Sequence, residues 1–192
     1  MTSPMFSIAQ TRSMPLCNMF VLDEVVSIRG DGRCLFRALA RAVGRETLTG
    51  TAETQAADRI RRELVDKFEA EREKWKERGR LAPIHMDWRY TSIDAEMEAM
   101  KKSTAEGGTL QLMIAAELLN FDIGLYQRCP KRKGSLNTLA EIDVFPCAGQ
   151  TNRRIHLLYV PTRGGREGHY NLLKKCQKQR SMNDFFKQSS SS

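Results

Sequence analysis

Two residues that lie far apart in the chain, Cys34 and His169, are of the types that nucleophilic thiol catalysis requires. Cys34 follows a glycine-rich turn and opens a helical pattern, so we expect it at a helix N-terminus. There the helix dipole and unpaired backbone N–H groups favour a thiolate. His169 begins a short strand pattern, and Asn171 falls on the same side of that strand. Asn171 would therefore orient the His169 imidazole, which would act as general base for the thiol.

The turn before Cys34 is the second feature suited to catalysis. Gly30 and Gly32 flank Asp31, and glycine permits the positive φ that would direct backbone N–H groups toward a developing oxyanion. Asp31 has two interpretations, either a turn former or a residue that shapes this oxyanion-side loop. The structural alternatives for the other candidates are a small buried hydrophobe for Cys34 and an ordinary edge-strand residue for Asn171.

The other two histidines are weaker candidates for a base. His85 lies in an irregular connection between Pro83 and Trp88, and His156 lies inside an apolar strand pattern, where a structural role is expected. A cysteine and a histidine distant in sequence form a catalytic pair only when the fold brings them together.

The elements that would position these residues follow from hydrophobic periodicity. Helices are predicted at 34–43, 51–78, 93–102 and 110–119, and strands at 20–28, 122–126, 141–145, 155–160 and 169–173. The strand at 155–160 is apolar enough to be central in a sheet. Because helices come mostly first and strands mostly last, we predict an α+β fold with a central, mostly antiparallel sheet flanked by helices.

Composition limits the class of protein. The 192 residues are 41% hydrophobic and 28% charged, which is typical of one globular domain with tails. No apolar run approaches the roughly 20 residues of a membrane span, and the first 17 residues have no secretory signal pattern, although a transit peptide is a lesser alternative. The five cysteines are widely spaced without metal-ligand spacing, which favours free thiols in a reducing compartment and no zinc or other cofactor.

The net charge of +8 indicates either acidic partners or simply a solvated basic surface. The chain has no basic patch interleaved with aromatic residues, so nucleic-acid binding is not expected. We expect a monomer in the nucleus and cytoplasm that does not bind membranes.

Three blocks of sequence make a resemblance specific. Gly30-Asp31-Gly32-Arg33-Cys34-Leu35-Phe36-Arg37-Ala38-Leu39 resembles the signature of the OTU (ovarian tumour) family of cysteine proteases. Gly107-Gly108-Thr109-Leu110-Gln111-Leu112 resembles the second block of that family, and Gly168-His169-Tyr170-Asn171-Leu172 resembles the third. The blocks occur in family order and at family-like spacing, over about residues 20–173.

The resemblance implies a papain-like fold that cleaves after the C-terminal glycine of ubiquitin, with ubiquitin or polyubiquitin as substrate. Carried over by position, it implies Cys34 as nucleophile, His169 as general base and Asn171 as the third member. Asp31 matches a family aspartate of the oxyanion-side loop.

The sequence departs from the family pattern at two positions. Arg33 replaces the commoner Asn before the cysteine, and Glu106 stands where many members have Trp before Gly107 and Gly108. Neither change removes a catalytic group, but the second leaves the subfamily open. Two alternatives follow: a viral or mobile-element OTU protease acting on ubiquitin-like modifiers or its own polyprotein, and a catalytically silent module that binds ubiquitin or PCNA.

The C-terminal tail carries a separate motif. Residues 179–186, Gln179-Arg180-Ser181-Met182-Asn183-Asp184-Phe185-Phe186, resemble a PIP box, the peptide that binds the sliding clamp PCNA. A single 3₁₀ turn would bring Met182, Phe185 and Phe186 to one side, while Gln179 would enter a polar pocket. The structural alternative is a terminal turn that packs both phenylalanines on the domain.

The chain therefore divides into three predicted parts. Residues 1–19 form a flexible N-terminal segment, residues 20–175 an OTU-like catalytic domain, and residues 176–192 a basic flexible tail with the PIP-box-like motif.

Overall fold

The computed structural model describes residues 24–44, 48–81, 90–102, 104–128, 139–149, 151–161 and 168–174. The helices are α1 (Cys34–Val43), α2 (Gly50–Ala70), α3 (Arg72–Leu81), α4 (Ile93–Met100) and α5 (Thr109–Leu119). The strands are β1 (Glu24–Val26), β2 (Asp122–Arg128), β3 (Leu139–Phe145), β4 (Arg154–Pro161) and β5 (Gly168–Lys174). Outside β1 and the region of α2 and α3, each element begins and ends within two residues of its prediction.

The strands form one sheet in the order β1-β5-β4-β2-β3, so β4 is central, as predicted. Neighbouring strands are antiparallel except for β2 and β4, which run parallel. The parallel pair arises because the chain returns from β3 across β2 before it enters β4. The predicted α+β fold with a mostly antiparallel sheet is confirmed.

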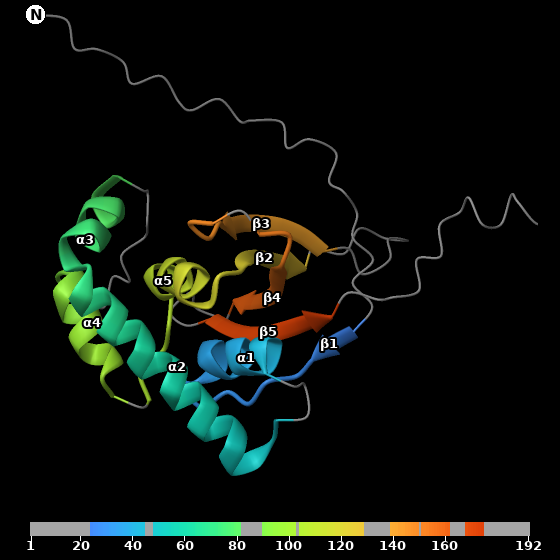
Figure 1. Cartoon of the computed structure of the whole chain (residues 1–192). Helices are drawn as coiled ribbons and strands as arrows, with labels where there is room; N and C mark the ends of the chain where they lie inside the picture. The colour runs from blue at the N-terminus through green and yellow to red at the C-terminus, as the bar shows by residue number, and fades with distance from the viewer. Residues whose placement is uncertain are drawn as a thin grey trace, which may run out of the picture.

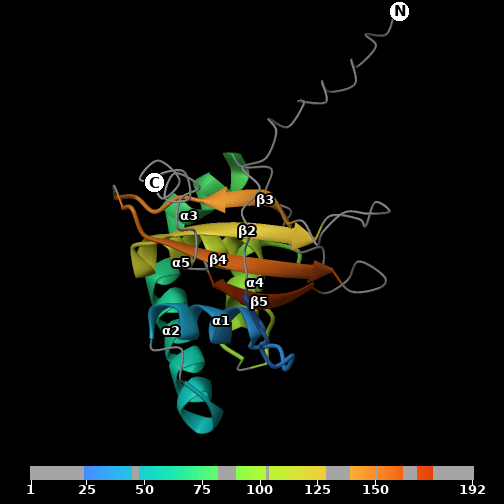
Figure 2. The same cartoon turned by 90° about the vertical axis from the view of Figure 1, so that its right-hand side faces the viewer.

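The helices gather on one side of this sheet (Figure 1), and Figure 2 shows strands β3, β2, β4 and β5 in front of α5 and α4. The core lies between these layers. Leu35, Phe36 and Leu39 on α1 are fully buried, together with Leu112 on α5 and Leu157 on β4. This apolar contact fixes α1 against the sheet and thereby sets the position of its N-terminus.

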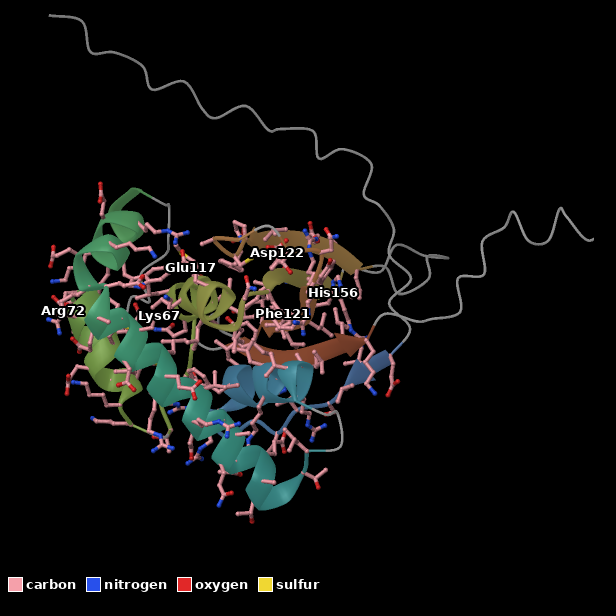
Figure 3. The ribbon with its side chains drawn as sticks, viewed as in Figure 1. Lys67, Arg72, Glu117, Phe121, Asp122 and His156 are labelled. Atoms are coloured by element: carbon pink, nitrogen blue, oxygen red, sulfur yellow. The ribbon has the colours of Figure 1, made fainter. Side chains whose placement is uncertain are left out.

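The predicted single helix at 51–78 is wrong in one respect, because it divides into α2 and α3 at Glu71. Glu71 leaves the helical region, with φ −123°. Its carboxylate holds Lys67 on α2 and Lys74 on α3, with Nζ–Oε distances of 2.9 and 2.7 Å. Lys74 also contacts Glu117 of α5 at 2.8 Å, so the bend lets α3 pack toward α5 (Figure 3).

Of the predicted strand at 20–28, the structure describes residues 24–28, and among these β1 (Glu24–Val26) ends two residues before the predicted end. The physical reason lies at Ile28, whose backbone N–H donates to the side chain of Asn171 at 2.9 Å instead of to a neighbouring strand. The chain thus leaves the sheet edge here and turns toward α1. Residues 20–23, the predicted segment 1–19 and the predicted tail 176–192 lie outside the described residues.

Candidate active site

Cys34 is the first residue of α1, where the turn at 30–33 enters the helix. Gly32 in this turn has φ +75°, and a Cβ there would lie 2.2 Å from the carbonyl oxygen of Thr104, so the position requires glycine. The N-cap residue Arg33 makes no side-chain capping hydrogen bond. The N–H groups of the first turn therefore make no hydrogen bond to the N-cap side chain. They are left to stabilise a negative charge that develops beside them.

Cys34 is only 6% exposed, and its thiol lies against the backbone of Tyr170 on β5. Burial raises the pKa of this thiol, and the negative charge of Glu106 raises it further. Hydrogen bonds from the backbone of Tyr170 and Leu35 act in the opposite direction but do not offset the burial. The backbone N–H groups at the helix N-terminus therefore favour the thiolate, as the sequence predicted, but in the free protein desolvation outweighs them.

His169 and Asn171 lie on β5 and are hydrogen-bonded, with 3.2 Å between His169 Nε2 and Asn171 Oδ1. Both side chains fall on the same side of the strand, as their spacing predicted. Asn171 Oδ1 also accepts the N–H of Ile28, which identifies this amide atom as the oxygen. Nε2 of His169 must then carry the proton that it donates to Asn171, and Nδ1 is left as the basic nitrogen.

The basic nitrogen of His169 faces the turn that leads to the cysteine. A Cβ built on Gly30 would lie 3.6 Å from His169 Nδ1, which is an ordinary contact distance, so the ring packs beside this glycine. Cys34 itself lies against Tyr170, the residue between His169 and Asn171. The fold therefore places Cys34 against the segment of β5 that carries His169 and Asn171, more than a hundred positions later in the sequence.

Asp31 is part of the same turn, and it is half-buried. Its carboxylate accepts the N–H of Arg33 at 3.2 Å and pairs with Arg37 Nη2 at 2.7 Å. The hydrogen bond from Arg37 lowers the pKa of Asp31, so this carboxylate is charged at neutral pH. These contacts suit a residue that shapes the oxyanion-side loop rather than one that touches the reacting atoms.

The second sequence block lies beside the first turn of α1. A Cβ on Gly107 would lie 2.5 Å from Leu35 Cδ2, so the close approach of the buried elements here requires glycine. Gly108 donates its N–H to Gln111 Oε1 at 2.7 Å and so caps α5. Glu106, which replaces the family Trp, is close enough to influence the Cys34 thiol.

His156 is confirmed as a structural histidine. Its Nδ1 lies 3.0 Å from the hydroxyl of Tyr126, which in turn donates to Glu141 at 2.7 Å. Burial raises the pKa of Tyr126 to about 12, so the phenol stays protonated in this network. His85 lies outside the described residues, as do Gln179, Met182, Phe185 and Phe186 of the PIP-box-like motif.

Sequence reasoning missed two arginines that contact the nucleophile turn. Arg37 is part of the first block, and Arg61 lies 27 positions after Cys34 on α2. Arg61 packs its guanidinium 4.4 Å from the centre of the Phe36 ring and donates to the carbonyls of Gly32 and Lys102. Burial lowers the pKa of Arg61 to about 10. Arg37 is marked in the sequence by its place in the first block, and Arg61 by its place among the apolar positions of its helix.

Among the side chains that the structure describes, no three His, Cys, Asp or Glu lie close enough to hold a metal ion. No helix in the described ranges is both long and apolar enough to cross a membrane.

A buried cysteine at a helix N-terminus, packed against a strand whose histidine is hydrogen-bonded to an asparagine, is the arrangement expected of a cysteine protease. The sequence model of the OTU-like cysteine proteases matches residues 29–170. The chain therefore belongs to the OTU-like cysteine protease family. A search of curated protein sequences finds no significant match.

Solved structures show the same fold at low sequence identity. The OTU domain protease of Taggert virus is 15% identical, with a TM-score of 0.55 over 84% of this chain and 83% of that one. The Hazara virus OTU bound to ubiquitin is 18% identical, with a TM-score of 0.53 over 81% and 82%. An OTU deubiquitinase from Wolbachia pipientis, also bound to ubiquitin, is 15% identical, with a TM-score of 0.50 over 79% and 95%.

Proposed function

We propose that the chain is a thiol-dependent deubiquitinase that hydrolyses peptide and isopeptide bonds after the C-terminal glycine of ubiquitin. The observation that carries this proposal is the His169–Asn171 hydrogen bond of 3.2 Å, which leaves Nδ1 facing the turn that ends in Cys34. Membership of the OTU-like cysteine proteases supports it, as do the Hazara virus and Wolbachia relatives, which are bound to ubiquitin. The catalytic domain spans residues 20–175.

The first half of the reaction acylates the cysteine. His169 Nδ1 takes the proton of the Cys34 thiol, and the sulfur attacks the carbonyl carbon of the terminal glycine. The carbonyl oxygen becomes an oxyanion beside the N–H groups of the turn and of the first turn of α1. The C–N bond then breaks, the imidazolium donates its proton to the leaving amine, and ubiquitin remains as a thioester on Cys34.

The second half restores the enzyme. Water gives a proton to His169 Nδ1 and attacks the thioester carbonyl, and the C–S bond breaks. The thiolate takes the proton back, and ubiquitin leaves with a free carboxylate. Because burial raises the pKa of the Cys34 thiol, the first half needs His169 to take the thiol proton, and the second half needs it as the base that activates water.

The test uses a ubiquitin probe with an electrophile at its C-terminus, with adducts detected by gel shift and intact mass. Wild type should form a covalent adduct, and Cys34→Ala should form none. Cys147→Ala is the matched control, because Cys147 is also a free cysteine but lies after β3, and it should react as wild type does. An adduct on Cys34→Ala would overturn the assignment of the nucleophile.

The alternative substrate class is distinguished by a second probe. A protease that acts on a ubiquitin-like modifier would react with the probe built on that modifier and not with the ubiquitin probe. A silent module would bind ubiquitin without reacting with either probe, but Cys34, His169 and Asn171 are all retained in this chain, which argues against it.

For the tail we propose binding to PCNA through Gln179, Met182, Phe185 and Phe186, on the basis of the motif alone. A tail bound to PCNA would raise the local concentration of the protease near ubiquitin attached to the clamp. Deletion of residues 179–186 should abolish PCNA pull-down and leave cleavage of free ubiquitin chains unchanged. Pull-down that survives the deletion would refute the tethering.

A further inference from the structure

A chain of charged contacts connects the nucleophile turn with the start of α2. It begins at Asp31, whose Oδ1 accepts the N–H of Arg33 and whose Oδ2 pairs with Arg37 Nη2 at 2.7 Å. Arg37 Nε also donates to Asp31, at 3.3 Å. Arg37 therefore holds the carboxylate in a fork, and that carboxylate fixes the backbone one residue before Cys34.

Arg37 is held in turn by α2. Its Nη1 lies 3.3 Å from Glu53 Oε2, and its Nη2 donates to Thr54 Oγ1 at 3.0 Å. Glu53 Oε1 accepts from Arg41 Nε at 2.8 Å, so both oxygens of this carboxylate are engaged. Arg37 is 4% exposed and Glu53 is 5% exposed. The pair is therefore almost fully removed from water.

Stability alone does not account for a buried ion pair at this position. Removing two charges from water costs as much as their attraction returns, and apolar residues of similar volume often stabilise a protein equally well. An apolar pair would make no directional contact with Asp31. Arg37 contacts Glu53 of α2 and holds the Asp31 carboxylate through two N–H groups, so the position of α2 determines the position of the turn.

We propose that Arg37 and Glu53 are positioning residues for the nucleophile. Glu53 fixes the rotamer of Arg37, Arg37 fixes the carboxylate of Asp31, and Asp31 holds the turn so that its N–H groups and the Cys34 thiol keep their reactive geometry. The role rests on the proposed thiol catalysis but not on ubiquitin being the substrate. Neither residue touches the substrate.

The distinguishing test is a double-mutant cycle between Asp31 and Glu53, which contact Arg37 rather than each other. We expect Asp31→Asn to lower kcat on a fluorogenic ubiquitin substrate about 100-fold and Glu53→Gln about 10-fold, with KM unchanged in both. The double variant should remain near 100-fold, because both changes interrupt the same chain of contacts. A loss of kcat near 1,000-fold in the double variant would mean that the two residues act independently. It would overturn the proposal that Glu53 acts on the turn through Arg37 and Asp31.

A matched variant controls for the change of charge on α2. Glu63 lies on the same helix in an exposed 3.9 Å pair with Arg59. Glu63→Gln should keep the kcat of wild type. Arg37→Lys should restore part of the kcat that Arg37→Met loses, because Lys keeps the charge but not the fork.

A second readout does not depend on the substrate. In Glu53→Gln, backbone hydrogen exchange of the peptide covering residues 29–36 should be faster than in wild type, whereas Glu63→Gln should match wild type. Unchanged exchange at 29–36 in Glu53→Gln would overturn the positioning role whatever the substrate is. A wild-type protein that leaves the ubiquitin substrate uncleaved would instead refute the proposed function alone.

Discussion

His169 and His156 lie on the neighbouring strands β5 and β4, and the pairing register places both on the same face of the sheet. Each ring is hydrogen-bonded to a polar side chain. His169 donates to Asn171, while His156 contacts the Tyr126 hydroxyl, which is itself held by Glu141. The two histidines therefore differ in what lies beyond the first hydrogen bond.

The difference shows what makes a histidine a candidate base. The backbone N–H of Ile28 fixes the Asn171 amide, which orients His169. Nδ1 of His169 then lies beside Gly30, in the turn that leads to Cys34. The Tyr126–Glu141 pair leads instead to Arg154, at 3.0 Å from Glu141, and ends in a surface ion pair. The two sites therefore differ in the neighbours of each histidine. Only His169 lies beside the turn that leads to a cysteine.

The largest expected effect comes from substituting each histidine in turn, which tests the difference between them directly. His169→Gln should lower kcat/KM on a ubiquitin substrate about 1,000-fold, because the thiol loses the base that takes its proton. His156→Gln should change kcat/KM less than about threefold and cost about 1 kcal/mol of stability for one lost hydrogen bond. Steady-state kinetics and urea denaturation check both values. Equal losses in the two variants would refute the distinction between the histidines.

A smaller effect is expected from the residue that orients His169. Asn171→Ala should lower kcat about 100-fold, because the ring loses its fixed tautomer and Ile28 loses its acceptor. Asn171→Asp keeps an oxygen acceptor for both donors and should retain most of the activity. If Asn171→Ala matches wild type in kcat, then Asn171 has no orienting role.

The charge that supports the turn should appear as a pH-dependent stability. Because Arg37 lowers the pKa of Asp31 in the folded state, its contribution is present above the unfolded pKa of about 3.9 and is lost as the pH falls through the folded value. Asp31→Asn should therefore cost about 2 kcal/mol in urea denaturation at pH 7 and clearly less near pH 3. The same cost at both pH values would contradict the assignment.

The smallest effect concerns the environment of the thiol. Because burial and the charge of Glu106 raise the pKa of Cys34, alkylation by iodoacetamide should become faster as the pH rises above neutrality. Glu106→Gln should lower this pKa and speed alkylation at pH 7.5, while Glu98→Gln, on the exposed side of α4, should not. Fast alkylation that persists unchanged down to pH 5 would show instead a thiolate paired with an imidazolium in the free protein.

Much of the fold could be predicted because its signals are local. The helix at Cys34–Val43 follows from the spacing of apolar residues, and the central position of β4 follows from its continuous apolar run. The break at Glu71 could not be predicted, because neither glycine nor proline marks it and the bend is stabilised by contacts with Lys74 of α3. The parallel pairing of β2 and β4 could not be predicted either. It depends on the path of the chain from β3 back past β2 to β4, and not on the sequence of either strand.

The candidate site divides in the same way. Cys34, His169 and Asn171 could be selected by residue type, spacing and family resemblance, and their catalytic roles stay predictions. The end of β1 at Val26 could not be foreseen, because it depends on the Asn171 side chain taking the N–H of Ile28 across the sheet edge. The raised pKa of Cys34 is also a tertiary effect, since it depends on how deeply the helix end is buried.

The sequence by itself determined the residue types, the turn that needs Gly32, the order of the elements and the family. These properties depend on local backbone preference and on the short-range spacing of apolar residues. Only the tertiary structure decided which nitrogen of His169 is basic. It also decided that Glu53 contacts Arg37, because burial, tautomer and ion pairing arise from residues that the chain brings together only when it folds.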